Sequence, residues 1–144
     1  MKELVLTPRE IEKRWRAAAR RAADFRAAAE SAPTKKIKAM LVRRGRFQIS
    51  VNDLVKLLEH QRGNCCFFGN KLTRDGLLKA ALILDDPKDG WVKGNVAWGS
   101  HRYALMKGKV SHKMMLALAR RVMTRANRPI PRFREARTSR ELGT

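Results

Sequence analysis

The fold is decided by residues 81–98, which read ALILDDPKDGWVKGNVAW. The apolar run Leu77–Leu84, which leads into this stretch, has β character and predicts a strand. Asp85–Gly90 combines proline, glycine and three acids, and this composition predicts a loop. Asn95–Trp98 predicts a second, short extended segment. The centre of the chain is therefore expected to hold two short extended segments around an acidic loop.

Helices are predicted downstream of this stretch. His101–Lys107 is expected to form one or two helical turns that stop at Gly108. Ser111 is expected to cap a last helix that runs to about Arg125.

Two more helices are predicted upstream. Thr7 and Glu10 form a capping box with proline between them, so a helix is expected to begin here and to run to about Ser31. Ser50 is expected to cap a second helix that Gly63 ends. The apolar stripe of the first helix consists of Ile11, Trp15, Ala18, Ala22, Phe25 and Ala29.

The charge of the chain points to a polyanionic partner. Lys and Arg number 33 against 13 Asp and Glu, which gives a net charge of +20 and a pI near 11.3. Solubility accounts for a net charge of only about 2–8 on a small domain. Nucleic acid is the leading partner, because each neutralised phosphate releases counterions. A membrane is the competing partner, but no apolar run of about 18 residues is present. We therefore expect a cytoplasmic, nucleoid-associated protein.

The charge is unevenly distributed. Its net value is +9 over residues 1–46, +5 over residues 47–119 and +6 over residues 120–144. This distribution predicts a basic N-terminal helix and linker arm at 1–46, a folded core at 47–125 and an Arg-rich flexible tail at 126–144.

The only cysteines, Cys65 and Cys66, are adjacent and are expected to be thiols rather than a structural disulfide. Cys66–Phe68 is a further strand candidate. The aromatic residues Phe67, Phe68, Trp91 and Trp98 are expected to pack in the core.

Several short motifs follow one another in a fixed order. They are Cys66 with Gly69, Ala81–Leu84, Asp86–Trp91, Gly94–Trp98 and Met106–Gly108. In this order and spacing, the segment Ile49–Met123, roughly half of the chain, resembles the HNH, or ββα-metal, nuclease family. The resemblance implies an α+β fold with a ββα core, and the residues outside it add a long N-terminal helix, a C-terminal helix and basic extensions. A small basic chain of this kind is similar to phage and mobile-element products.

In that family a β-hairpin and the following helix hold one divalent metal against the scissile phosphate, and a side chain on the strand activates water. The resemblance places the metal-binding acid at Ile83, the base at Leu84 and the metal-binding Asn at Ala104. These three side chains can neither bind Mg²⁺ nor move a proton. We therefore favour a degenerate HNH fold that binds DNA, with no catalytic residue, no metal and no other cofactor.

Zinc is not expected either. The zinc-binding branch of the family carries two Cys-x-x-Cys pairs, whereas the corresponding places here are Cys66–Gly69 and Trp98–His101.

Two alternatives stay open. The first is an active Mg²⁺-dependent nicking or homing endonuclease, in which Asp85 and His101 serve as metal ligands and catalytic residues of a shifted site. The second is an RNA-binding structural component, such as a ribosome-associated factor. A host or phage nucleoprotein complex is a further candidate partner, and the sequence indicates no oligomeric state.

The residues expected to contact phosphates are basic side chains of the arm, the end of the core and the last helix. We expect them to bind duplex DNA in preference to RNA and largely without sequence specificity. They are Arg9, Lys13, Arg16, Arg20, Lys35, Lys36, Lys38, Arg43, Arg44, Arg46, Arg102, Lys107, Lys109, Lys113, Arg120 and Arg121.

Overall fold

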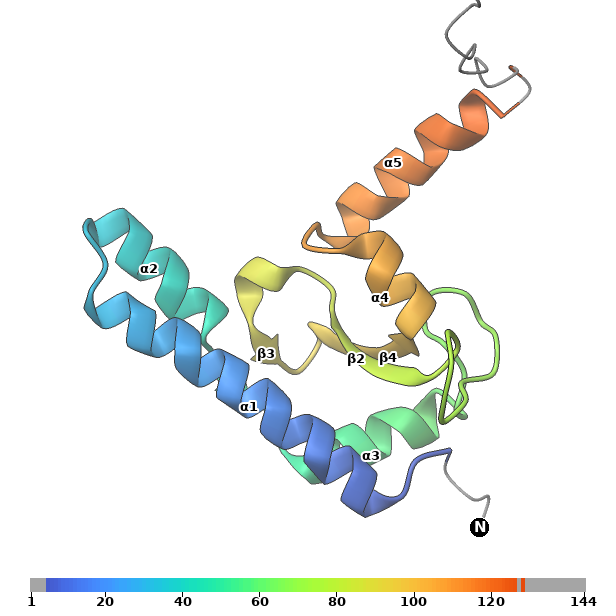
Figure 1. Cartoon of the computed structure of the whole chain (residues 1–144), viewed down its shortest axis with the longest axis horizontal. Coiled ribbons are helices and arrows are strands. Elements are labelled where there is room, and N and C mark those ends of the chain that lie inside the picture. Colours follow the sequence, from blue (N-terminus) through green and yellow to red (C-terminus); the bar gives the residue numbers. More distant parts are fainter. Residues whose placement is uncertain (1–4, 127, 129–144) are drawn as a thin grey trace, which may run out of the picture.

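The structure is a computed structural model and describes residues 5–126 and residue 128 (Figure 1). This part of the chain has a mixed α+β fold with five α-helices and two small sheets. The helices are α1 (Pro8–Glu30), α2 (Lys35–Arg44), α3 (Val51–His60), α4 (His101–Lys107) and α5 (His112–Thr124). The strands are β1 (Phe47–Gln48), which pairs parallel with β3 (Trp91–Val92), and β2 (Ala80–Leu84), which pairs antiparallel with β4 (Val96–Ser100). A short 3-10 helix, η1, spans Pro87–Asp89.

The predicted start of α1 is confirmed. The Thr7 hydroxyl accepts a hydrogen bond from the Glu10 amide at 3.2 Å, and the Glu10 carboxylate accepts one from the Thr7 amide at 3.3 Å. The predicted apolar stripe faces the core, where Ile11, Ala18 and Ala22 are buried. A single helix face therefore anchors α1 along its length.

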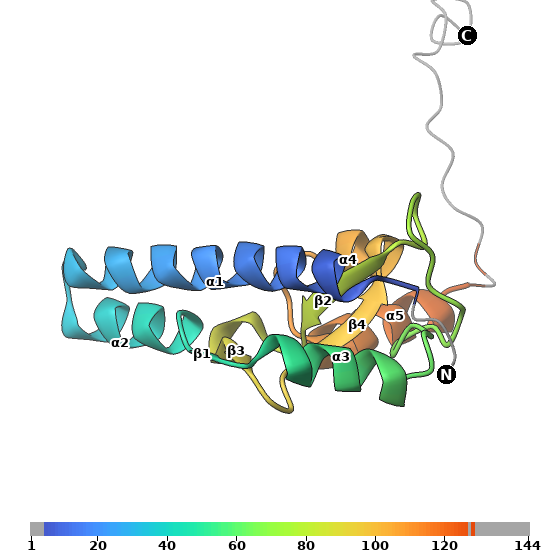
Figure 2. The same ribbon diagram turned by 90° about the horizontal axis from the view of Figure 1, so that it is seen from below.

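The linker predicted after α1 contains a helix, α2. Thr34 caps it, because its hydroxyl accepts a hydrogen bond from the Ile37 amide at 3.1 Å. No residue of α2 is buried, and its apolar stripe is short, with only Ile37 and Leu41 half-buried one turn apart, so the helix signal in the sequence is weak. It folds back along α1, and α2 and α3 lie one after the other beside α1 (Figure 2). Arg26 of α1 fastens the end of α2 with a hydrogen bond to the Gly45 carbonyl at 2.7 Å.

The N-terminal helix shares its core with the rest of the chain. Leu6 and Ile11 belong to the same buried cluster as Leu54 and Trp98. The Trp15 indole also donates a hydrogen bond to the Ile49 carbonyl at 2.8 Å. The boundary predicted between residues 46 and 47 therefore does not divide the hydrophobic core.

The β2–β4 hairpin packs on α3 through Trp98, which is fully buried. Its indole donates to the Leu54 carbonyl at 2.9 Å. The Gln61 side chain accepts from the Trp98 amide at 3.0 Å and donates to the Trp98 carbonyl at 2.7 Å. Gln61 thus satisfies the outer edge of β4 as a neighbouring strand would.

The strand predicted at Cys66–Phe68 is wrong, because this segment forms a turn. The Gly69 amide donates to the Cys65 carbonyl at 2.9 Å, and the Phe68 amide donates to the Cys65 sulfur at 3.4 Å. Local hydrogen bonds therefore replace a strand ladder. Both cysteines are free thiols, Cys65 buried and Cys66 exposed. The predicted run Leu77–Leu84 is extended only from Ala80 onward.

The two C-terminal helices are confirmed as predicted. Helix α4 ends at Gly108, and the Ser111 hydroxyl caps α5 by accepting from the Met114 amide at 3.0 Å. Helix α5 projects from the body of the protein, and none of its residues is buried (Figure 1). The predicted tail at 126–144 lies outside the described residues except for residues 126 and 128. Within the described part of the chain, no helix combines the length and apolar character that a membrane span requires.

We predict that Gly90→Ala destabilises the protein by about 3–5 kcal/mol. Gly90 has a φ of +74° and a ψ of −168°, a region that only glycine adopts readily. An added Cβ would also lie 2.8 Å from the Arg43 carbonyl oxygen and 2.9 Å from that of Arg46. Chemical denaturation followed by circular dichroism measures the change in stability.

The matched control is Gly94→Ala. Gly94 also has a positive φ of +88°, but a Cβ there meets no atom within 4 Å. We expect a destabilisation of only about 1–2 kcal/mol from the backbone conformation alone. Equal destabilisation by the two variants would contradict the close approach of α2 to Gly90.

Candidate nucleic-acid interface

Most of the side chains predicted to contact phosphates are accessible. Of these sixteen residues, fourteen are exposed and Arg44 is half-buried. Lys107 is buried, with only 4% of its surface exposed. The structure therefore removes Lys107 from the accessible set and leaves the other predicted contacts available to a ligand.

Acidic side chains neutralise few of these cations. Among the described residues, only Arg16 and Arg43 of the predicted set form ion pairs, with Glu12 and Asp89 respectively. The remaining exposed cations carry charge that no ion pair within the described chain offsets. Such a surface has a positive electrostatic potential, which attracts polyanions most strongly at low salt.

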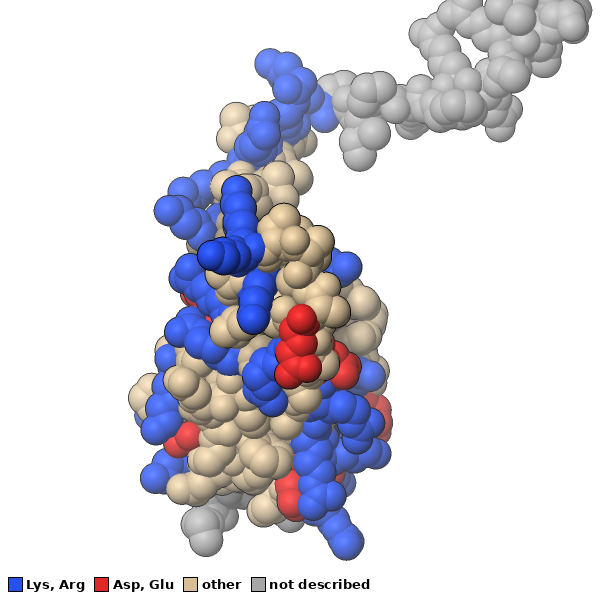
Figure 3. All heavy atoms as spheres, turned by 90° about the vertical axis from the view of Figure 1, so that its left-hand side faces the viewer, with Lys and Arg blue, Asp and Glu red and all other residues tan. Residues whose placement is uncertain are grey.

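The basic side chains gather where α1 and α2 meet and along α5. Figure 3 views the molecule from the α1–α2 end: Lys and Arg outnumber the acidic side chains on this face, and the upper part toward α5 is almost free of visible acidic side chains. The contributing residues of α2 are Lys35, Lys36, Lys38, Arg43 and Arg44.

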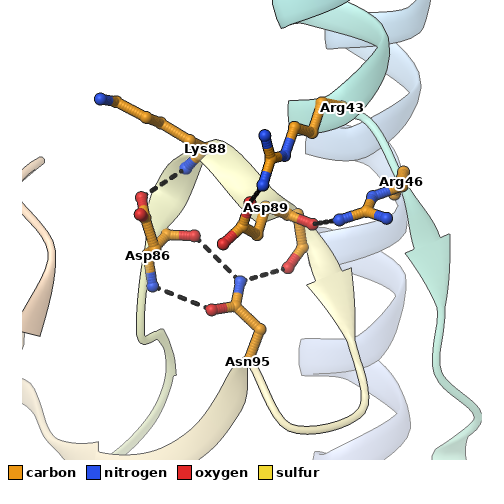
Figure 4. Close-up of polar contacts among 7 residues, drawn as sticks. Arg43, Arg46, Asp86, Lys88, Asp89 and Asn95 are labelled. Atoms are coloured by element: carbon orange, nitrogen blue, oxygen red, sulfur yellow. Dashed lines mark hydrogen bonds and ion pairs between the residues drawn. The ribbon is translucent and has the colours of Figure 1, made fainter.

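The loop between β2 and β4 is closed by the side chain of Asn95 (Figure 4). Its amide nitrogen donates to the Asp86 carbonyl at 2.9 Å and to the Gly90 carbonyl at 2.7 Å. Its amide oxygen accepts from the Asp86 amide at 2.9 Å. Asn95 is 8% exposed, so these three bonds are largely shielded from water.

Two of the predicted phosphate contacts also hold α2 against this loop (Figure 4). Arg43 pairs with the Asp89 carboxylate at 2.5 Å, and Arg46 donates to the Asp89 carbonyl at 3.0 Å. The Trp91 amide in turn donates to the Arg46 carbonyl at 2.9 Å. These contacts fix the position of α2, and of α1 beside it, relative to the β2–β4 hairpin.

The HNH resemblance assigns metal binding and proton transfer to three positions, and the side chains at these positions carry no metal-binding atom. Ile83 is only 4% exposed, and a Cβ built on Gly99 would clash with its terminal methyl and lie 3.0 Å from the Phe67 ring. Leu84 packs against the hydrophobic core, and Ala104 is half-buried. A divalent metal requires oxygen, nitrogen or sulfur ligands, so these residues do not fit one.

Aromatic side chains pack between the β2–β4 hairpin and α4. The Phe67 ring stacks on Tyr103 with ring centroids 4.1 Å apart and lies 4.7 Å from the His112 ring. The Tyr103 hydroxyl hydrogen-bonds His112 Nδ1. Burial, reinforced by the charge of Asp85, raises the pKa of Tyr103 to about 12. The phenol is therefore a neutral hydrogen-bonding group at physiological pH.

The structure does not bring together Asp85 and His101, the two residues of the alternative shifted site. Asp85 follows the last residue of β2, whereas His101 follows the last residue of β4, and these strands run antiparallel. The His101 amide donates to the Lys79 carbonyl at the far end of β2. The backbones of the two residues are thus separated by the length of the hairpin, roughly 15–20 Å. Within the described chain, no group of three His, Cys, Asp or Glu side chains is placed to hold a metal ion.

The buried Lys107 lies near the acidic loop. Desolvation lowers its pKa, while the charges of Asp85 and Asp86 counteract this effect. Its sequence position, next to Gly108 in a basic segment, gave no sign of burial. Lys107 therefore contributes to the electrostatics of the acidic loop rather than to the accessible basic surface.

Sequence reasoning omitted three cations that the structure places with His101 around one cleft. They are Arg14, Arg21 and Lys79. Arg14 and Arg21 are seven residues apart and share a face of α1, which is the only signal that the sequence offers. Many solvated helix faces show the same spacing, so the cleft itself could not be predicted.

Comparison of the chain with protein-family models, with curated proteins and with solved structures gives no match. The role of the interface is therefore inferred from the chemistry of its own side chains.

We predict that Tyr103 titrates at about pH 12 in the folded protein, compared with about 10 for an exposed phenol. Tyr103 is the only tyrosine in the chain, so absorbance at 295 nm reports it alone. Because the folded-state pKa is raised, the stability that Tyr103 contributes is fully present below pH 10. It is lost as the pH rises from about 10 to about 12.

The matched variant is Asp85→Asn. Desolvation is the main cause of the raised pKa and the charge of Asp85 is the second. We expect the variant to titrate below the wild type but still above pH 10. A wild-type midpoint at pH 10 would contradict the burial of the hydroxyl.

Proposed function

We propose that this chain binds duplex DNA through its phosphates, on an HNH-like scaffold that does not carry out metal-dependent cleavage. The observation that supports binding is the set of exposed cations that have no acidic partner among the described residues. Each phosphate that they neutralise releases condensed counterions, which drives association at low salt.

The order of elements supports the HNH-like scaffold. Strands β2 and β4 pair antiparallel, and α4 begins at the residue after β4. Asn95 braces the intervening loop, as the HNH resemblance implies for an Asn before the second strand. The absence of cleavage is supported by the side chains of Ile83, Leu84 and Ala104, which lack metal-binding atoms.

Binding is expected to be largely independent of sequence. The exposed cations lie mainly on α1, α2 and the segment from α4 to α5, and contacts from such surfaces to phosphates carry no base information. Structured RNA offers the same phosphate chemistry, so the binding measurements include it as a competitor.

We predict that replacing Lys35, Lys36 and Lys38 by Gln weakens duplex binding and flattens its salt dependence. All three are exposed on α2 and form no ion pair with a described residue. The slope of log K against log salt should decrease in magnitude by about 2–3, since each phosphate that is no longer neutralised accounts for about 0.9. Fluorescence anisotropy with a labelled duplex at several salt concentrations measures the slope.

The control replaces Lys56, Arg62 and Lys71 by Gln, which removes the same charge from exposed positions outside the predicted set. We expect a clearly smaller change of slope. Identical slopes for the two triple variants would show that only net charge matters, and a wild-type slope near zero would refute phosphate-driven binding. Tighter binding of structured RNA than of duplex would favour the RNA alternative.

We also predict that the purified protein leaves supercoiled plasmid intact in the presence of Mg²⁺ or Mn²⁺. The carboxylate of Asp85 and the imidazole of His101 lie at opposite ends of the β2–β4 hairpin and cannot share a metal. Agarose gel electrophoresis detects nicked plasmid. Nicking that disappears in Asp85→Ala would overturn the proposal that the scaffold does not cleave DNA.

A further inference from the structure

A cleft of about 320 Å³ opens between α1, β2 and α4. Its apolar lining includes Leu82 and Trp91, and the remaining apolar residues are all alanines from these three elements. Alanine side chains leave space that longer side chains would fill. The alanines are Ala17, Ala18, Ala80, Ala81 and Ala104.

The polar side chains that line the cleft are basic or imidazole. Arg14 and Arg21 come from α1, Lys79 precedes β2, and His101 begins α4. Among the described residues, no acidic side chain lines the cleft. A concave surface with low-dielectric walls and charge of one sign concentrates its potential on an anion inside it.

The Arg14 side chain is held in place by backbone carbonyls of β2 and α1. Arg14 Nε donates to the Ala80 carbonyl at 3.2 Å, and Arg14 Nη1 donates to the Glu10 carbonyl at 3.3 Å. The His101 amide donates to the Lys79 carbonyl at 2.9 Å, so these two residues are adjacent on neighbouring strand ends. A guanidinium that is already ordered loses less entropy when it binds a ligand.

We propose that this cleft is a phosphate-binding site that takes one phosphate of a bound polynucleotide. The phosphate chemistry follows from Arg14, Lys79 and His101, whose donors form charge-assisted hydrogen bonds to oxyanions. Arg21 lies two helical turns, about 10 Å, from Arg14 and lines the same cleft. The assignment of this phosphate to a polynucleotide rests on the proposed function. The anion site itself does not depend on that function.

The test uses the full-length ¹⁵N-labelled protein and inorganic phosphate at constant ionic strength. We expect phosphate to shift the arginine Nε signal of Arg14 and the backbone amides around Ala80 and His101. The double variant Arg21→Gln, Lys79→Gln should bind phosphate about tenfold or more weakly, because two charged donors are removed. Arg14 is left unchanged because its guanidinium also holds the Ala80 carbonyl.

The control variant is Arg62→Gln, Lys71→Gln, which removes the same charge from exposed positions outside the cleft. We expect it to change phosphate affinity by less than about twofold. Because Lys79 is half-buried, the single variant Arg21→Gln is measured as well, and thermal denaturation reports whether each variant is folded. Arg21 is exposed, so this variant is expected to fold and to show a measurable part of the weakening.

A competition experiment distinguishes the source of the phosphate. Duplexes with and without a 5′-phosphate are added to the phosphate-bound protein. Equal displacement by both duplexes would assign the cleft to a backbone diester, and displacement only by the phosphorylated duplex would assign it to a strand end.

Phosphate shifts spread over the whole surface, or equal weakening in the cleft and control variants, would overturn the cleft proposal. If duplex binding then remains steeply salt-dependent, the proposed function stands without the cleft. If phosphate binds in the cleft but no duplex binds, the proposed function fails and the anion site stands.

Discussion

The closure of the loop between β2 and β4 by Asn95 is the constraint on which the rest of the structure depends. Its amide group makes three hydrogen bonds to the backbone of Asp86 and Gly90. These bonds fix where β4 begins opposite β2, and they present Gly90 to the carbonyls at the end of α2. The buried Asn95 amide, with all three of these hydrogen bonds made, favours this one loop conformation, because another conformation would leave buried polar groups unpaired.

The basic helices are therefore part of a rigid scaffold. Arg26 holds the end of α2 to α1, while Arg43 and Arg46 hold α2 to the loop that Asn95 closes. Cations on a fixed frame lose less conformational entropy on binding than cations on a free arm. On the proposed function, this rigidity would align α1 and α2 against a duplex before contact.

Helix ends, which depend on neighbouring residues, could be predicted from the sequence. Packing and burial, which depend on residues far apart in the chain, could not. The capping box at Thr7, the cap at Ser50 and the ends of α4 depend on neighbours within four residues, and all were predicted. Helix α2 was not predicted, because its half-buried residues are only Ile37, Leu41 and Arg44 and its end is held by a hydrogen bond from the distant Arg26. The burial of Lys107 and the cationic cleft arise from residues far apart in the chain, so no local pattern could reveal them.

If the scaffold is HNH-like, as we propose, the packing around Ile83 explains how it is stable without a metal. Ile83 lies over Gly99 beside Phe67, and Phe67 stacks on Tyr103 of α4. Hydrophobic and aromatic contacts thus join the hairpin to the helix, a task that a shared metal would perform in an active site. A carboxylate at position 83 would have to be buried among these side chains, which is costly without a cation beside it. On the proposed scaffold, the apolar packing that secures the fold is therefore the same feature that excludes the chemistry.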